Sequence, residues 1–564
     1  MPPKKPPKRL TDISLENVGD YLANYCMSVS KKSFVMIGSL NLAALSIDDE
    51  ASWSSPDVRY HRTYQQDHER QAFTYVDECI HWLREQFFSS IPWYCHQALV
   101  NHILLVLSKA THTAKATFRK TAGGPQADWN RHVVYVTVRF VKTILHPRVK
   151  KLDLNHIGPK ALRDEIYRGL EQLSGLETLN LGSGSGPAAA SGSSGTEIIR
   201  KRVFMSFKYL RNLTSLTFTN ECQNDTLAVV GQNCRQLSYL DIAGSQGVTD
   251  QGASWLQGCK ELATLDLYQT SISIEGYAQL LLALPKLNSV GRCDAFGQIL
   301  EYLSTYNRDP VKLCIKYFHS RDVSYDQLRL LTATCPKLTH VSLYVDEDAG
   351  NLLEPLISLQ ELSEVKLLAC NFYTDKVDEL LQHKGRQLTL LHLEHIDELD
   401  MNALCCIAEN CPNLNRLVFF SCDFVENFGQ SLSDKKFPSP PFKHLQSLVC
   451  VSESAPNIIE FLLVHAKNLK SVQFGSTAWF NDDTVAKVLA KGALKWVEEI
   501  RILRSYELTM RAVCALLEQC PNLHILAEMD GWEGISQPEL LRLRKKIKEE
   551  NLDLDTFIAW SVTG

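Results

Sequence analysis

Cysteine and histidine are the residue types whose spacing in this sequence comes nearest to a metal-binding or reactive site. Cys405 and Cys406 are followed by Cys411, and thiolates gathered this closely are ligands for soft metals. His392 and His395 lie three positions apart, but the sequence offers no obvious third ligand for them. The cysteines fall where a helix needs small apolar residues. We therefore interpret them as core packing, and we predict no metal site and no cofactor.

The usual sequence motifs of enzymes are missing. There is no phosphate-binding G-x-x-x-x-G-K-[ST] loop, no G-x-S-x-G turn, no H-E-x-x-H helix and no C-x-x-C pair. Residues 182–195 consist of Gly, Ser, Ala and Pro, but no Lys-Ser/Thr pair follows them as a phosphate-binding loop requires. No arrangement supplies a nucleophile, a base and an orienting group together. The sequence predicts a binding protein without a catalytic residue.

A repeated frame must position whatever this protein binds. The pattern C-x-x-L-x-x-L begins at Cys234, Cys259, Cys335, Cys411 and Cys520, and further copies lack the cysteine. The first leucines of four successive copies stand at 338, 362, 388 and 414, which are spacings of 24, 26 and 26 residues. This period lies within the range of leucine-rich repeats.

Each repeat predicts one strand and one helix. The L-x-x-L-x-L stretch turns its leucines inward with the two-residue period of a strand, and the residues after it have helical spacing. One unit cannot bury its apolar side alone, so the units must stack. The predicted fold class is α/β: a leucine-rich-repeat solenoid, shaped as a horseshoe with parallel strands on its concave face, preceded by an all-helical module.

Composition divides the chain into four parts. Residues 1–9 form a basic tail, and residues 10–145 lack the repeat and predict helices at 12–26, 72–88, 92–109 and 133–145, with a polar, loop-like insert near 46–71. The solenoid occupies residues 146–530, including a degenerate copy near 310–315 and the Gly/Ser/Ala segment 182–195, which we expect to be a flexible loop. A C-terminal helical cap is expected over 531–564.

The C-x-x-L-x-x-L-x-L frame resembles the cysteine-containing subclass of leucine-rich repeats. Gly247-Val248-Thr249-Asp250 between strand and helix adds to that resemblance. In that subclass the array is typically the substrate-recognition half of a ubiquitin ligase receptor, as in F-box/leucine-rich-repeat proteins. The resemblance implies that this chain is a non-catalytic substrate receptor of a cullin-RING ligase. An interaction scaffold without any ligase is the alternative.

A first short motif lies near the amino end. Leu10, Ser14 and Val18 share one face of the first expected helix, because they are spaced four residues apart. The spacing resembles the elongin-C-binding box L-x-x-x-C-x-x-x-apolar of cullin-2 receptors, with Ser14 where that family prefers Cys. An ordinary amphipathic core helix explains the same three residues.

A second motif contains Ile91, Pro92, Cys95 and Leu99 and resembles the cullin-2 box, apolar-Pro-x-x-apolar-x-x-x-apolar. Pro92 suits the start of a helix. The beginning of an F-box core looks much the same. The two motifs together imply adaptor binding, with elongin C and a cullin as partners, or Skp1 if the F-box interpretation holds.

The target protein should bind where strand residues alternate with the inward leucines and so face the concave side. Aromatic and arginine side chains at such positions often anchor protein interfaces. The expected partner-binding residues are Tyr239, Asp241, Asp266, Tyr268, His340, Tyr344, Lys366, His392, Arg416 and Phe420. The alternative for each of them is that it only covers the inner wall of the solenoid.

Charge and leader sequences limit the remaining classes. The 564 residues carry 59 Lys and Arg against 64 Asp and Glu, a net charge of -5, which argues against nucleic-acid binding. No apolar run reaches the length of a membrane span, and no apolar stretch follows the basic start, as a secretory signal would require. We therefore expect a cytoplasmic or nuclear protein whose 17 cysteines are reduced.

Overall fold

The computed structural model describes residues 10–44, 57–120, 125–155, 157, 160–182, 203–307, 309–345, 352–425, 437, 440–454, 456–476 and 480–556. Within the helices, the side chains of 10–16, 34–35, 37–44, 57–69, 110–120, 125–131, 134, 160–161 and 165 also lie outside this description. The chain forms two compact bodies, which we call the first unit (Lys8–Lys286) and the second unit (Leu287–Gly564).

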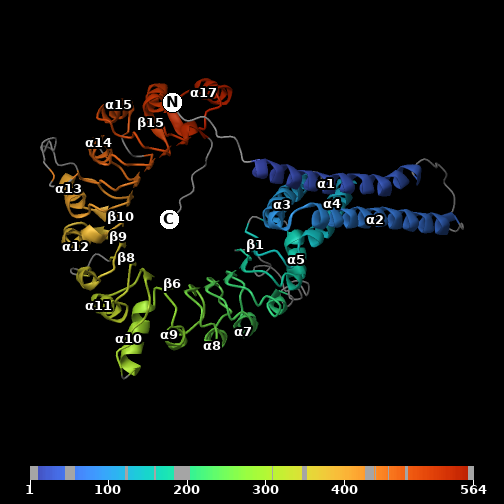
Figure 1. Cartoon of the computed structure of the whole chain (residues 1–564), viewed down its shortest axis with the longest axis horizontal. Helices are drawn as coiled ribbons and strands as arrows, with labels where there is room; N and C mark the ends of the chain where they lie inside the picture. Colours follow the sequence, from blue (N-terminus) through green and yellow to red (C-terminus); the bar gives the residue numbers. More distant parts are fainter. Residues whose placement is uncertain are drawn as a thin grey trace. The chain divides into compact units, whose positions relative to one another are not determined.

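Four long helices begin the first unit: α1 (Leu10–Ala44), α2 (Asp57–Ser90), α3 (His96–Lys120) and α4 (Pro125–Ile144), with the short turn η1 (Trp93–Cys95) before α3 (Figure 1). Helix α1 packs against the other three. Leu22, Leu83, Ile103 and Phe140 form part of the buried core between them. Deeper in the bundle, Ser33 Oγ lies 2.6 Å from His132 Nε2. The predicted helical character of this region is confirmed.

Helix α2 begins within the segment that the sequence analysis assigned to a polar loop. That expectation is wrong for residues 57–71, which are helical, whereas residues 45–56 lie outside the described residues. Residues 57–71 contain three Gln and three Arg, residue types that favour helices as well as water. Polarity alone therefore does not separate a polar helix from a loop.

The repeats of the first unit carry five strands that pair in parallel and in sequence order. Their central leucines are fully buried, and the helices lie on the opposite side (Figure 1). The strands are β1 (Lys151–Asp153), β2 (Thr178–Asn180), β3 (Ser215–Thr217), β4 (Tyr239–Asp241) and β5 (Thr264–Asp266). The helices are α5 (Lys160–Gly169), η2 (Leu170–Gln172), α7 (Asn224–Asn233), α8 (Asp250–Leu256) and α9 (Ile274–Ala283). The expected flexible loop at 182–195 lies, after Gly182, outside the described residues.

The second unit continues the same pattern with longer strands, again parallel and in sequence order. The strands are β6 (Ser289–Arg292), β7 (Tyr317–Ser320), β8 (His340–Tyr344), β9 (Glu364–Asn371), β10 (Leu390–Asp397), β11 (Arg416–Phe420), β12 (Ser447–Val451), β13 (Ser471–Phe474), β14 (Glu499–Ile502) and β16 (Ile525–Ala527). β15 (Ser505–Thr509) pairs separately with β17 (Trp532–Gly534). Within this unit the strands line the inner side of a curve and the helices its outer side (Figure 1).

The helices of the second unit are α10 (Phe296–Tyr306), α11 (Tyr325–Thr334), η4 (Glu354–Ser358), α12 (Val377–Lys384), η5 (Gly385–Gln387), α13 (Met401–Asn410), α14 (Pro456–His465), α15 (Asp482–Ala490), α16 (Met510–Gln519), η7 (Met529–Gly531) and α17 (Gln537–Glu549). The expected C-terminal cap region contains α17, which starts with a capping box between Ser536 and Glu539. In the described part of the chain, each helix is too short or too polar to cross a bilayer.

The frame cysteines end helices and fill the core. Cys234, Cys335, Cys411 and Cys520 follow α7, α11, α13 and α16, and each is fully buried. The backbone N–H of each donates to the carbonyl four residues earlier. Burial raises the pKa of the Cys234 thiol to about 12, so it is a neutral, small core group.

Polar side chains fix one repeat to the next. The first helical residue of one repeat accepts the backbone N–H that starts the following helix: Thr249 donates to Asn224 at 2.9 Å, and Ser273 donates to Asp250 at 2.8 Å. In the second unit, the Thr509 N–H donates to Asp482 in the same way. Together with the strand register, these bonds confirm the predicted leucine-rich-repeat fold in both units. The division predicted at residue 145 stays a prediction.

Candidate protein-binding surface

A groove of about 600 Å³ runs along the strand face of the second unit. Its walls come from the outward-facing residues of the strands from β6 to β13. These residues stand in rows, because the parallel register places each one beside its equivalent on the neighbouring strand. Tyr317 lies beside His340, His340 beside Glu364, and Leu390 beside Arg416. We call this hollow the groove.

One ion pair and one contact between a histidine and a carboxylate lie along the groove wall. Lys366 Nζ is 2.8 Å from Glu394 Oε2, and His340 Nε2 is 2.9 Å from Glu364 Oε1. Burial works against ionisation of Glu394, but the hydrogen bond and charge of Lys366 outweigh it and hold the pKa of Glu394 below its usual value. The Tyr317 ring packs on the His340 ring with centroids 4.3 Å apart.

His392 lies in the middle of the groove and is uncharged at neutral pH. Burial lowers its pKa to about 4, and the nearby cations Lys366 and Arg416 act in the same direction. His392 Nε2 is 3.4 Å from Glu394 Oε2 but makes no hydrogen bond with the described residues. The ring is therefore a neutral polar group with unused hydrogen-bonding capacity.

Two further polar groups of the groove make no hydrogen bond with the described residues. Arg416 Nε and Ser342 Oγ have no hydrogen-bond partner among the described residues, and Arg416 forms no ion pair with them. Buried polar atoms normally find partners in a folded protein, so such atoms in a hollow are candidates for ligand contacts.

An apolar area adjoins these groups. Val418 and Phe420 on β11 and Val449 and Val451 on β12 line the groove side by side. The combination of an apolar area with a few polar groups is typical of a site that binds another molecule.

The structure brings together five of the predicted partner-binding residues in this groove: His340, Lys366, His392, Arg416 and Phe420. Tyr344 lies on β8, outside the groove lining, and is 41% exposed. Their role in binding stays a prediction.

The other four predicted residues, Tyr239, Asp241, Asp266 and Tyr268, belong to the first unit and are not groove residues. Asp241 and Asp266 accept the backbone N–H groups of Ala243 and Tyr268. Burial raises the pKa of Asp266, and the Asp241 charge adds to the effect against the Tyr268 hydrogen bond. These carboxylates therefore shape their own turns, and their part in partner binding stays a prediction.

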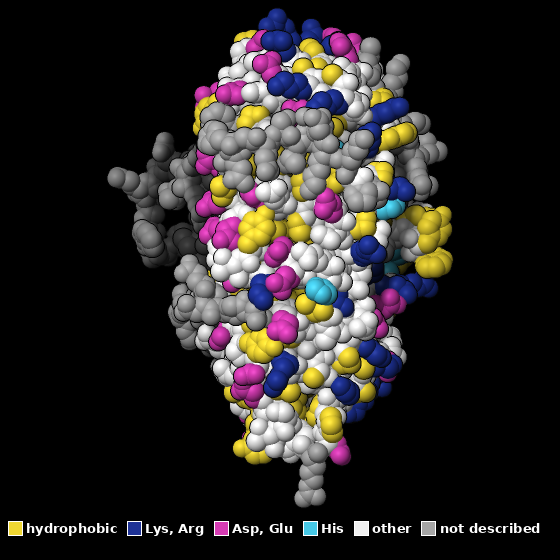
Figure 2. Space-filling view, turned by 90° about the vertical axis from the view of Figure 1, so that its left-hand side faces the viewer, with side chains coloured by type: hydrophobic (Ala, Val, Ile, Leu, Met, Phe, Trp, Pro, Cys, Tyr) yellow, Lys and Arg dark blue, Asp and Glu magenta, His cyan; other side chains and the backbone are white. Residues whose placement is uncertain are grey.

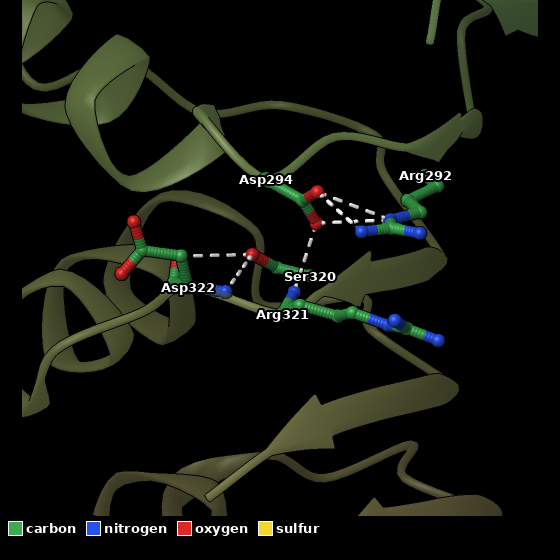
Figure 3. Close-up of polar contacts among 5 residues, drawn as sticks. All are labelled: Arg292, Asp294, Ser320, Arg321 and Asp322. Carbon is green, nitrogen blue, oxygen red and sulfur yellow. Dashed lines mark hydrogen bonds and ion pairs between the residues drawn. The ribbon is translucent and has the colours of Figure 1, made fainter. Parts of the chain in front are cut away.

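Among the groove residues that the sequence analysis missed are Tyr317 and His319. Both lie on β7, whose pattern is Ile315-x-x-Phe318-x-Ser320, so the degenerate repeat lies later in the chain than the frame assigned near 310–315. Ser320 replaces an inward leucine, and its buried hydroxyl bonds with the backbone of Asp322 (Figure 3). An aromatic residue in place of the strand leucine was the signal that could have identified β7.

A polar cluster holds the β6 and β7 ends of the groove. Arg292 donates to both carboxylate oxygens of Asp294, which also accepts the Arg321 N–H at 3.0 Å (Figure 3). Burial opposes ionisation of Asp294, but these hydrogen bonds keep its pKa below its usual value. The guanidinium of Arg292 is thereby fixed beside His319, whose pKa is lowered by burial and by Arg292.

The helical side of the second unit looks different. Figure 2 views that side, and acidic and basic side chains are interspersed there with small hydrophobic areas. Several neighbours of opposite charge are paired, such as Asp326 with Arg329 on α11 and Glu460 with Lys491. The groove is therefore the better candidate for a specific site.

The residues first considered as metal ligands do not converge. Cys405 and Cys411 are buried in the repeat core, and Cys406 is half-buried. His395 is exposed and has a left-handed backbone with φ of 52°, which separates it from His392. Across the part of the chain that the structure describes, no three His, Cys, Asp or Glu side chains come together as a metal site would require.

The adaptor-motif residues lie on the helices of the first unit. Leu10 and Ser14 belong to α1, but their side chains lie outside the described residues, and Val18 is 37% exposed. Ile91 and Cys95 are half-buried and Pro92 is exposed at the turn between α2 and α3, whereas Leu99 is buried in the bundle. Their adaptor role stays a prediction.

No family model and no curated protein matches the chain. An internalin from Listeria monocytogenes is 14% identical to it, with a TM-score of 0.35 over 63% of this chain and 89% of the internalin. An LRR protein from Leptospira interrogans is 15% identical, with a TM-score of 0.28 over 72% of this chain and 94% of its own.

A chain of the yeast Rad7 and Elc1 complex is 17% identical to this protein, with a TM-score of 0.23 over 47% of this chain and 83% of its own. Scores this low carry no functional argument. The assignment rests on the repeated frame and the parallel strands of the chain itself. The fold is a leucine-rich-repeat fold.

Proposed function

We propose that this protein is a non-catalytic recognition subunit of a cullin-RING ubiquitin ligase. It holds a protein target on the strand face of the second unit, and its N-terminal helices dock it to elongin C and a cullin, or to Skp1. The ligase partners transfer ubiquitin, and this chain selects the target.

The observation that carries the adaptor half is the exposed apolar turn between α2 and α3. Trp93 and Tyr94 are 66% and 70% exposed, next to Pro92 and the half-buried Ile91. Two large aromatic side chains exposed side by side form an apolar patch, and such patches are typical of interaction surfaces. The turn also contains the proline-led motif that resembles the cullin-2 box.

The groove supports the target half of the proposal. It is open and it combines apolar side chains with polar groups that lack partners, which suits a protein segment. The absence of a recognisable reactive group in the sequence fits a binding role.

The test of the adaptor half is direct binding of the purified full-length chain to purified elongin B–elongin C with cullin-2, and to Skp1 with its cullin. We expect one of the two assemblies to bind. Ile91→Asp should abolish binding, because the interface would bury an unpaired charge. Leu10→Asp should do the same if the α1 motif takes part.

Leu282→Asp is the matched control, because Leu282 is an apolar residue of the same unit, 50% exposed on α9. It should bind as the wild type does. If neither assembly binds the wild-type protein, the ligase role is wrong and the interaction scaffold is the better description. Loss of binding in both Ile91→Asp and Leu282→Asp would indicate a general effect of charge.

A further inference from the structure

We propose that the groove binds an extended, acidic segment of the partner protein, with one carboxylate on Arg416 and an adjacent apolar side chain against Phe420, Val449 and Val451. The inference rests on the proposed function only in that the bound segment belongs to the target. It does not depend on a ligase.

The pairing of charges among the described groove residues leaves one cation, Arg416, available to an anion. Two acids, Glu364 and Glu394, are each occupied by a neighbouring His340 or Lys366. Arg416 has no counter-ion among the described residues. One positive charge in a half-buried hollow gains most from a single negative partner, because water screens the pair only in part.

Two histidines of the groove, His319 and His392, lie near its cations. The pKa of His319 is lowered by burial and then by the cations Arg292, Lys366 and Arg321, and that of His392 by burial and then by Lys366 and Arg416. Both rings therefore lie near two or more cations, with one opposing carboxylate each, Asp294 at His319 and Glu394 at His392. Neutral His392 and Ser342, whose Nε2 and Oγ have no hydrogen-bond partner among the described residues, can bond the polar atoms of a bound backbone.

The anion that fits is a carboxylate. A phosphate carries nearly two negative charges and usually binds a cluster of basic groups, whereas the other basic residues on the groove wall are engaged by Glu364 and Glu394. The apolar area of Val418, Phe420, Val449 and Val451 lies on the same two strands as Arg416 or on the next one. The ligand must therefore place an apolar side chain close to its carboxylate, as an acidic peptide does.

The length of the groove also indicates a peptide. Seven strand spacings of about 4.8 Å separate β6 from β13, which gives roughly 34 Å. An extended chain covers about 3.3 Å per residue, so about ten residues cross the groove. The groove strands are paired with each other, so recognition must come from side chains rather than from added strand pairing.

The experiment is selection of displayed random peptides of about ten residues on the immobilised full-length protein. The wild type should enrich Asp or Glu next to Leu, Ile or Phe. Fluorescent copies of the enriched peptides then give affinities for the variants. Arg416→Ala should weaken binding about tenfold or more, the usual loss for a charged hydrogen bond. Replacing the peptide's acidic residue by its amide should have a similar effect on the wild type.

Arg416→Glu tests the charge logic through a change of peptide preference, which an unfolded variant would not show. It should reject the acidic peptides and, in a fresh selection, enrich Lys or Arg at the same place. Arg501→Ala is the matched control, since Arg501 lies on the same strand face, is paired with Glu499 and is outside the groove lining. It should bind the acidic peptides as the wild type does.

Enrichment of basic peptides, or no enrichment by the wild type, would overturn the proposal. Equal losses in Arg416→Ala and Arg501→Ala would overturn it too, since the groove cation would then have no special part. Tighter binding of a phosphoserine copy of the peptide would replace the carboxylate by a phosphate. The adaptor is absent from this assay, so its result is separate from the test of the ligase role.

Discussion

The two units share one repeat but differ in how long each strand runs. The strands of the first unit have three residues each, whereas β8 to β12 have between five and eight. Longer strands present a third outward position, occupied by Tyr344, Glu394, Phe420 and Val451. Phe420 and Val451 at this third position line the groove, which also extends over the four-residue strands β6, β7 and β13.

The difference in strand length follows from the side chain at the third strand position of each repeat. Four of the five first-unit strands end in Asp or Asn, and that side chain accepts the N–H two residues later. The donors are Asn155, Gly182, Ala243 and Tyr268. Such turns compete with strand pairing and end the strand. The equivalent positions in the second unit include Ser342, Lys366, His392 and Val418, which leave the strand to continue.

The largest expected effect tests whether the cores of the units are alike. Leu265→Ala in β5 and Leu391→Ala in β10 both remove a fully buried strand leucine. Each should cost about 3 kcal/mol, because a cavity is left in a stacked core. Denaturant unfolding measures it, with exposed Leu282→Ala as a control that should change little. A tolerated substitution in one unit alone would show that the cores differ as well as the faces.

The next effect is a pH dependence that belongs to the second unit. The pKa of His392 is about 4 in the folded protein and 6.5 ordinarily, so the unfolded chain takes up a proton first as the pH falls. Stability should therefore fall between pH 6.5 and 4 by about 2 kcal/mol through this residue. His392→Gln should lose that part of the pH dependence. Lys366, Glu394 and Arg416 remain in both proteins, so parallel curves would contradict the assignment.

A smaller effect concerns the third outward position. Phe420→Ala should weaken the selected acidic peptides about tenfold, because the apolar contact is lost. Tyr268→Ala, an aromatic change on the short-strand unit, should leave peptide affinity unchanged. Fluorescence anisotropy with one labelled peptide compares both. A loss in Tyr268→Ala of similar size would mean that the first unit also takes part in binding.

The smallest effect examines the turns that shorten the strands. Asp266→Asn keeps the acceptor for the Tyr268 N–H but removes the charge beside Asp241. Since the pKa of Asp266 is raised, ionisation costs stability as the pH rises, and the variant should be about 0.5 kcal/mol more stable at neutral pH. The gain should vanish in acid, where both carboxyls are protonated. Asp266→Ala should instead destabilise the unit.

The repeat frame made most of the fold predictable. Leucines such as Leu240 and Leu391 have one role, burial, so their spacing reports the strand directly. The frame failed at β7, where Phe318 and Ser320 replace leucines and a turn hydrogen bond compensates for the buried hydroxyl. It also could not give the start of α2, because a solvated helix lacks an apolar signature.

The candidate site was predictable only as a row of alternating residues. Lys366 pairs with Glu394, whereas Arg416 has no such partner among the described residues. This difference depends on the register between neighbouring strands, which the sequence of one repeat does not determine. The strand-ending role of Asp241 and Asp266 was visible in the sequence as a repeated Asp or Asn after the second leucine. Where the groove lies along the chain could be found only once the strands were placed side by side in the structure.

The cysteines at the helix ends can report local opening of the individual repeats. Cys234, Cys335 and Cys520 are buried, and burial raises their pKa to about 12. A thiol-alkylating reagent therefore reacts with each of them only when its own repeat opens. Exposed Cys314 and Cys514 should instead be modified at once. Mass spectrometry of a timed alkylation would then rank the repeats by how often each one loosens, without a single engineered label.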